Sequence, residues 1–266
     1  MSQIRIMGNE ANCIDCISVA TMRESDARTI ASGVPGVTLM YRAALGVFRA
    51  VQWHGKTVIV TGSGNNGGDG YALACILREH GEDVRIVTLS DSRSADGAHF
   101  AERARLLGVP FALYAAGALE GADILVDCLL GTGFQGAVRE RYAQAIKEIN
   151  ASGAYVVSVD INSGMNGDSG EAETAVRSDL TVTIGFVKTG LVSENAGAYM
   201  KRLVWTDIGI KLCRKEQQIR ADGGAPSGAD VLPCPKWLDP VPVDVHGEAY
   251  PDCGHPEGAE ESGSTF

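Results

Sequence analysis

The chain has 266 residues, 45% of them hydrophobic, and a formal net charge of −10 at pH 7. This size and apolar content allow one large domain or two small ones with a substantial core. The negative charge argues against nucleic acid and anionic membranes as partners. No run approaches the roughly 18 apolar residues of a membrane span, and the first residues lack the apolar region of a secretory signal. We therefore expect a cytoplasmic protein.

Residues 18–53 have helical patterns, and the rest of the domain alternates between strands and helices. Helices are expected at Thr21–Ile30, Thr38–Val51, Gly70–His80, His99–Leu107 and Arg139–Ile149. Strands are expected at Thr57–Thr61, Val84–Leu89, Ile124–Leu129, Tyr155–Asp160 and Leu180–Ile184, with weaker signals at Phe111–Tyr114 and Leu203–Thr206. This alternation predicts a Rossmann-like three-layer α/β/α fold with a mostly parallel sheet. Ligands in such sheets bind outside the carboxyl ends of the strands, where the strand order reverses.

The chain changes character after Ile210. Residues 211–266 hold seven of the nine prolines and half of the net charge, and they show no apolar periodicity. We interpret residues 1–17 as an N-terminal extension, 18–210 as the domain, and 211–266 as an acidic tail that is largely disordered or loosely attached.

The first expected strand runs into Gly62-Ser63-Gly64-Asn65-Asn66-Gly67-Gly68-Asp69-Gly70, and a helical pattern follows. A strand, a glycine-rich turn and a helix together can present backbone N–H groups to a phosphate. The turn also carries two amides and a carboxylate, which a simple phosphate cradle does not need.

Asp69, Asp127 and Asp160 each lie near the end of an expected strand. If these strands are neighbours in a parallel sheet, the three carboxylates converge on one crevice, where their repulsion should raise at least one pKa. The nearby oxygen groups are Asn65, Asn66, Thr132 and Ser163. An all-oxygen set suits a hard cation and does not suit zinc or copper. The alternative is that Asp69 caps its helix, but capping does not explain the two further glycine-rich turns.

A dehydrogenase is the second interpretation of the glycine turn. Gly62-x-Gly64-x-x-Gly67 fits the dinucleotide fingerprint, and Asp91 lies where a ribose-binding acid is expected. The motif alone is weak, because the carboxylate of Asp69 competes with a pyrophosphate for the same N–H groups. No hydride-transfer partner is evident at the strand ends.

Several segments in the same order resemble the YjeF N-terminal domain family, whose enzymes are NAD(P)H-hydrate epimerases. They are the glycine turn from Gly62 to Gly70, Asp127 to Gly136, Val159 to Gly164, Lys188-Thr189-Gly190-Leu191 and Asp207-Ile208-Gly209-Ile210. Met22-Arg23 and Leu39 to Ala43 resemble the family's N-terminal helices. The resemblance covers about residues 18–210 and implies an isomerase that interconverts the R and S forms of NADHX and NADPHX, the 6-hydroxylated hydrates.

The resemblance also implies the roles of individual residues. Substrate would be bound by Asn65, Asn66, Gly67, Gly68, Asp69, Gly131, Thr132, Gly133, Phe134, Gln135, Gly136, Ala137 and Asp160. A potassium ion would be held by Asn66, Asp127 and Ser163, and Asp160 would be the catalytic residue. A homodimer and a separate NAD(P)H-hydrate dehydratase in the same pathway are the implied partners.

Three positions depart from the family pattern. Asn162 stands where a proline is usual, so we expect Ser163 to be less firmly placed. Tyr41 stands where an acid is common, and Ala44 where a glycine is common. A third interpretation, a non-enzymatic interaction module, fits less well because such members tend to lose the site residues that this chain keeps.

Overall fold

The computed structural model describes residues 4–7, 13–213, 230–232, 235–239 and 243–250. Its main body is an eight-stranded sheet in the order β12-β10-β8-β7-β6-β3-β4-β5, and every neighbouring pair is parallel. The strands are β3 (Lys56–Thr61), β4 (Asp83–Thr88), β5 (Phe111–Leu113), β6 (Ile124–Cys128), β7 (Tyr155–Val159), β8 (Leu180–Ile184), β10 (Leu203–Asp207) and β12 (Val243–Asp244). The predicted Rossmann-like α/β fold is confirmed.

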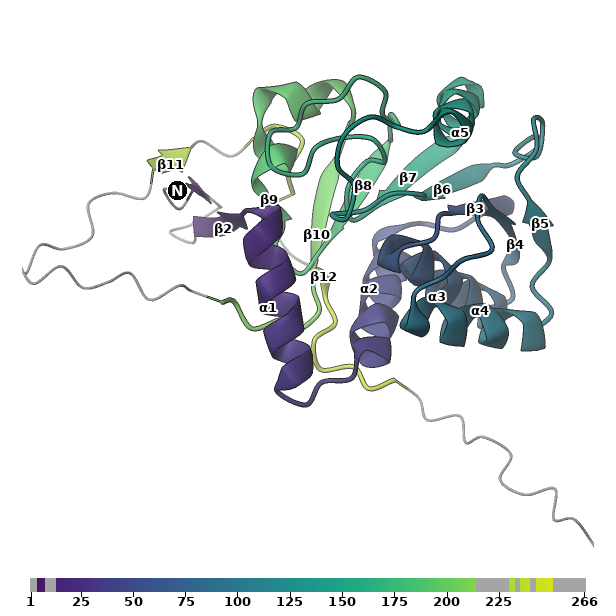
Figure 1. Cartoon of the computed structure of the whole chain (residues 1–266), viewed down its shortest axis with the longest axis horizontal. Helices are drawn as coiled ribbons and strands as arrows, with labels where there is room; N and C mark the ends of the chain where they lie inside the picture. Colours follow the sequence, from purple (N-terminus) through teal and green to yellow (C-terminus); the bar gives the residue numbers. More distant parts are fainter. Residues whose placement is uncertain (1–3, 8–12, 214–229, 233–234, 240–242, 251–266) are drawn as a thin grey trace, which may run out of the picture.

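Helices cover both faces of this sheet (Figure 1). They are α1 (Val19–Ala31), α2 (Gly36–Ala50), α3 (Asn65–Glu79), α4 (Ala95–Leu106) and α5 (Glu140–Ala151). Successive residues of β3 show why two layers form: Ile59 packs with α2, α3 and α4, whereas Val58 and Val60 pack with α5. A strand that is buried on both faces has a continuous apolar run, as Val58-Ile59-Val60 does.

The strand order reverses beside β3. The chain leaves β3 toward β4 and β5 on one side, and it then returns to β6, β7 and β8 on the other side. The carboxyl ends of β3 and β6 therefore flank the position at which ligands bind in sheets of this kind. Within the described part of the chain, no helix is both long and apolar enough to cross a membrane.

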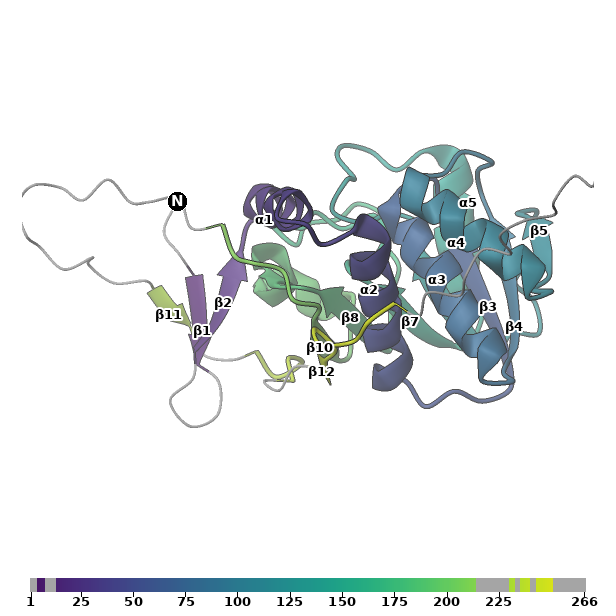
Figure 2. The same cartoon turned by 90° about the horizontal axis from the view of Figure 1, so that it is seen from below.

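A second sheet of four strands lies beside the main body. Its order is β11 (Asp230–Leu232), β1 (Ile4–Met7), β2 (Cys13–Ile17) and β9 (Val187–Lys188), followed by 3-10 turns at Thr189–Val192 and Glu194–Ala198. Figure 2 shows α1 between this sheet and α2. Because β9 follows β8 closely, the small sheet adjoins the carboxyl edge of the main sheet and brings Lys188 there.

Every described segment of the expected tail packs on the rest of the chain. Val243–Asp244 forms β12 at the edge of the main sheet, and the side chains of Leu238 and Val245 are buried. The ring of Tyr250 contacts those of Tyr41 and Phe100. The tail was expected to be loosely attached, and these contacts differ from that expectation. The sequence did not reveal them because short extended segments with single buried apolar residues show no periodicity. Lys211 N and Cys213 N donate to hydroxyl groups of α1, and Asp230–Leu232 forms β11 in the small sheet. The other tail residues lie outside the described ranges.

Candidate active site

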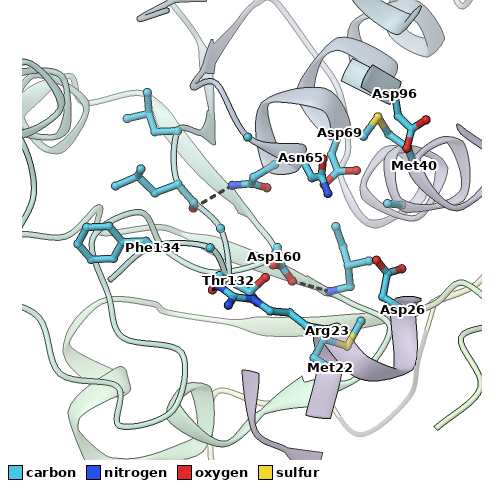
Figure 3. A pocket seen from close by; sticks show the side chains of 18 of the residues that line it. Met22, Arg23, Asp26, Met40, Asn65, Asp69, Asp96, Thr132, Phe134 and Asp160 are labelled. Atoms are coloured by element: carbon cyan, nitrogen blue, oxygen red, sulfur yellow. Dashed lines mark hydrogen bonds between the residues drawn. The ribbon is translucent and has the colours of Figure 1, made fainter. Parts of the chain in front are cut away.

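A cavity of about 690 Å³ opens at the carboxyl ends of the central strands (Figure 3). Its walls come from the first turn of α3, the loop after β6, the end of β7 and the helices α1 and α2. Ile208 and Ile210 complete the apolar part of the lining. The cavity lies beside the reversal of strand order, the position expected for a ligand from the sequence.

The helix after the glycine turn begins earlier than its sequence suggests. Its N-cap is Gly64 and its first residue is Asn65, whereas the pattern predicts a start at Gly70. Three glycines in the first six helical residues hide the start, since glycine is a poor helix former. Asn65 and Asn66 therefore lie in the first turn, where the backbone N–H groups have no helical acceptor. No side chain caps this helix, so the capping role considered for Asp69 is not observed.

Close backbone approach explains two glycines of this turn. A Cβ at Gly62 would overlap the carbonyl oxygen of Leu129, and a Cβ at Gly67 would overlap that of Gly62. A Cβ at Gly64 would meet nothing within 4 Å. Gly62 thus lets the end of β3 approach the β6 loop, and Gly67 lets α3 approach the turn at Gly62, while the space beside Gly64 is open.

Asp127 lies beneath the cavity and does not line it. Its side chain is fully buried, and Oδ2 accepts from Ser163 N at 2.9 Å and Ser158 Oγ at 3.0 Å. Oδ1 accepts from Ser163 Oγ at 2.5 Å and Leu129 N at 3.2 Å. Burial raises the pKa of Asp127, and these hydrogen bonds oppose the rise. The three carboxylates lie at one sheet edge, but only Asp69 and Asp160 share the cavity.

Ser163, Leu130 and Asn66 provide oxygen atoms close to Asp127 at the carboxyl edge of the sheet. Ser163 Oγ accepts from Leu130 N at 2.8 Å, and Asn66 Nδ2 donates to Leu130 O at 2.9 Å. The other end of that amide, Asn66 Oδ1, is buried and has no hydrogen-bond partner in the described part of the chain. An unpartnered buried acceptor is costly, and an alkali cation would satisfy it. The residues named for potassium therefore fit the ion by donor type.

The side chain of Asn162 fixes the turn in which the family usually has proline. Asn162 Nδ2 lies within 3.0 Å of Val176 O, Ser178 Oγ and Tyr199 O, and Oδ1 accepts from Thr181 Oγ1 at 2.6 Å. Asn162 is buried, so these bonds are made away from water. The expected loosening of Ser163 is not observed, because hydrogen bonds replace the ring as the constraint.

Asp160 combines an unusual backbone with an ion pair. It has a φ of 69°, a left-handed value that no other non-glycine residue in the described ranges adopts. Its Oδ1 accepts from Lys188 Nζ at 2.5 Å, and Lys188 is fully buried. A Cβ built on Gly131 would lie 3.5 Å from Asp160 Oδ2, so Oδ2 is the oxygen on the side of the β6 loop. Both residues line the cavity.

Asp69 faces the same cavity in different surroundings. Figure 3 shows Asp69 reaching in from α3 and Asp160 from the end of β7. No hydrogen bond joins the Asp69 carboxyl to the part of the chain that the structure describes. Burial raises the pKa of Asp69 well above its usual value, and the charges of Asp160 and Asp26 raise it further. Burial, Asp96 and Asp160 also raise the pKa of Asp26 on α1.

Most residues predicted to bind substrate lie at the cavity. Asn65, Asn66, Asp69, Asp160 and the loop residues Gly131, Thr132, Gly133, Phe134, Gln135 and Ala137 line it, whereas Gly67, Gly68 and Gly136 do not. Four further residues also line the cavity and have no role in the sequence-based prediction: Lys188, Asp26, Asp96 and Arg23. Arg23 Nη2 donates to Thr132 O at 2.5 Å and so joins α1 to the β6 loop. Lys188 and Arg23 each lie in a segment that resembles the family, whereas Asp26 and Asp96 had no signal in the sequence.

This parallel sheet defines a Rossmann-like α/β protein, and its cavity lies at the reversal of strand order, where sheets of this kind bind ligands. Residues 36–190 match the family described as YjeF-related protein N-terminus. The chain belongs to this family.

Similar proteins agree with that membership. A protein of Limosilactobacillus fermentum named NAD(P)H-hydrate epimerase is 40% identical over 72% of this chain and 95% of its own length. One of the same name from Rhodopirellula baltica is 35% identical over 67% of this chain and 78% of its own length. The bifunctional NAD(P)H-hydrate repair enzyme of Archaeoglobus fulgidus is 38% identical over 74% of this chain, which spans 42% of that enzyme. The crystal structure of yeast YNL200c shares the fold, with a TM-score of 0.65 at 18% identity over 76% of this chain and 97% of that one.

Proposed function

We propose that the protein is an NAD(P)H-hydrate epimerase, which interconverts the R and S forms of NADHX and NADPHX. The observation that carries this proposal is a sequence identity of 35–40% to proteins of that name, over two thirds or more of the chain. The cavity supports it, since Asn66, Asp69 and Asp160 line one volume above Asp127 and Ser163. Membership of this family also disfavours the dehydrogenase alternative.

The reaction resets one stereocentre, carbon 6 of the hydrated nicotinamide ring. This carbon carries a hydroxyl group and the ring nitrogen, so it can lose and regain the hydroxyl, or the ring can open and close. Either route needs a group that moves a proton and a group that stabilises developing charge. The catalytic carboxylate in this proposal is Asp160, whose Oδ2 is not taken by Lys188.

The proton-moving role fits Asp69 better than Asp160. The raised pKa of Asp69 keeps its carboxyl protonated at higher pH than an ordinary aspartic acid, and no partner holds its proton. When two carboxyl groups in one cavity have different surroundings, their pKa values differ. One can then act as an acid while the other stays charged. Asp69 would thus donate to, and accept from, the oxygen at carbon 6.

The polar end of the cavity suits the nucleotide part of the substrate. Free N–H groups in the first turn of α3 favour an anion such as a phosphate, and the positive end of the helix dipole adds to this. Substrate would also contact the loop from Gly131 to Ala137, whose glycines permit close approach of the backbone.

Potassium is the cofactor in this proposal. Asn66, Asp127 and Ser163 would hold it, and the unpartnered Asn66 Oδ1 is the observation that supports the site. The ion would supply fixed positive charge that offsets the acids and would anchor the β6 loop. A homodimer, a cytoplasmic location and a separate dehydratase partner complete the proposal; light scattering of the purified protein tests the first of these.

The direct test incubates the purified protein with R-hydrate, with and without potassium, and follows the S form by chromatography. Appearance of the S form well above the spontaneous rate supports the proposal. Hydride transfer with a common alcohol or hydroxy acid, without epimerisation, would support a dehydrogenase. Inactivity in both assays would support a binding module.

A further inference from the structure

The three N–H donors of Lys188 are all directed at groups around the carboxyl ends of β7 and β8. Its ammonium lies 2.5 Å from Asp160 Oδ1, 2.7 Å from the carbonyl oxygen of Ile184 and 3.1 Å from Thr183 Oγ1. An ammonium has three donors, so these contacts leave none to bind substrate. The side chain is fully buried although it belongs to the small sheet.

The ion pair fixes which oxygen of Asp160 the substrate meets. Oδ1 is occupied by Lys188 and lies 3.4 Å from Ile184 N, which leaves Oδ2 on the side of Gly131. The left-handed backbone of Asp160 is unfavourable for a non-glycine residue. Burying an ion pair costs desolvation free energy, and here the carboxylate also has an unfavourable backbone conformation. The pair is therefore not explained by a contribution to stability.

Taking the proposed function as its basis, we propose that Lys188 is a positioning residue that keeps Asp160 as a fixed anion with Oδ2 directed at the ring of the substrate. Asp160 then stabilises the cation of the reaction and does not carry the proton. This separates the two roles that a single carboxylate could otherwise share.

The chemical step that fits this arrangement is loss and return of the hydroxyl. Asp69 protonates the oxygen on carbon 6, the C6–O bond breaks with its electrons going to oxygen, and water leaves. The lone pair of the ring nitrogen becomes the N1=C6 bond, and the resulting cation lies against Asp160. Water then adds to the opposite face of carbon 6 and returns a proton to Asp69, so that atoms and charge balance.

Three variants test the role of Lys188: Lys188→Met, Lys188→Arg and Lys188→Ala. In Lys188→Met we expect kcat for epimerisation to fall at least about 100-fold while KM changes less than about 3-fold, since the lost interaction acts on the transition state. The kcat of Lys188→Arg should be at least about ten-fold higher than that of Lys188→Met. Added methylamine should partly restore the kcat of Lys188→Ala. Normal kcat in Lys188→Met would overturn the proposal, as would equal losses of kcat in Lys188→Met and Lys188→Arg with no rescue of Lys188→Ala by methylamine.

Lys201→Met is the matched control. Lys201 also pairs with an aspartate at 2.5 Å, namely Asp179, but it is exposed and does not line the cavity. Its replacement should leave kcat unchanged. Thermal unfolding of each variant identifies any that do not fold, and Lys188→Arg then remains as the test.

A binding measurement keeps this inference separate from the proposed activity. A fixed anion favours the cationic ring of NAD⁺ over the neutral ring of NADH, and calorimetry gives both affinities for the same protein. We expect the preference for NAD⁺ to fall at least about five-fold in Lys188→Met and to survive in Lys188→Arg. An unchanged or greater preference in Lys188→Met would overturn the role of Lys188, even if the wild-type protein showed no epimerisation.

Discussion

Ser163 binds Asp127 twice, through its main-chain N to Oδ2 at 2.9 Å and through its hydroxyl to Oδ1 at 2.5 Å. These bonds join the turn after β7 to the end of β6, directly beneath the cavity. Leu130 N donates to the same hydroxyl, and Asn66 donates to Leu130 O, so the three strand-end loops form one connected network. Asn66 Oδ1 is the buried acceptor of this network for which the described residues provide no hydrogen-bond donor.

Potassium should stabilise the protein through Asn66. Replacing tetramethylammonium chloride with potassium chloride at constant ionic strength should raise the midpoint of thermal unfolding by at least about 2 °C, since an ion that binds the folded state adds RT ln(1 + [L]/Kd). Asn66→Ala should lose this rise. Asn65→Ala, an exposed neighbour in the same turn, should keep it. Equal rises in both variants would place the ion elsewhere.

Replacement of Asp69 should stabilise the protein while removing activity. An aspartic acid whose pKa is raised on folding makes the wild-type protein lose stability as the pH rises from the unfolded value, near 3.8, up to the raised folded value. Asp69→Asn removes this loss. Its unfolding midpoint should therefore exceed that of the wild type by more at pH 8 than at pH 4.5.

Thermal unfolding at the two pH values checks this, together with the epimerase assay. Asp160→Asn is the contrast, because it leaves the buried Lys188 without its charged partner and should lower the midpoint. A constant difference between Asp69→Asn and the wild type across this pH range would show that the carboxyl of Asp69 is not perturbed.

Asn162 should contribute to stability through its buried side chain. Asn162→Ala leaves the hydroxyls of Ser178 and Thr181 and two carbonyl oxygens with fewer partners, at a cost of about 1–3 kcal/mol. Denaturant unfolding measures this cost. Asn166→Ala, in an exposed turn where Oδ1 accepts from Asp168 N and Ser169 N, should cost less. If the two variants lost the same stability, Asn162 would not replace the proline of the family.

The glycines of the first turn should differ in tolerance. Gly67→Ala places a Cβ against the carbonyl oxygen of Gly62 and should destabilise the protein or force β3 and α3 apart. Gly64→Ala meets no atom within 4 Å, and its unfolding midpoint should stay within about 2 °C of the wild type. Similar midpoints for the two variants would contradict the close approach of α3 to this turn.

The sheet and the positions of the strand-end residues could be predicted from sequence, because buried parallel strands have apolar runs and each turn carries glycines. The sequence did not predict that Asp127 lies beneath the cavity, since a carboxylate at a strand end can turn toward ligand or toward neighbouring loops. Lys188 was missed as a partner of Asp160 because β9 belongs to another sheet. The contributions of Asp26 and Asp96 depend on helix packing, which periodicity does not place.

The most direct test of the account is the rate at which purified Asp160→Asn interconverts the R and S hydrates, measured beside the wild-type protein at saturating potassium. Carboxylate and amide have nearly the same shape, so the change removes charge and little else. We predict wild-type epimerisation, with at least about a 100-fold loss in Asp160→Asn while circular dichroism shows an intact fold. Turnover of Asp160→Asn within about three-fold of the wild type would contradict the assignment of Asp160 as the anion that stabilises the reacting ring.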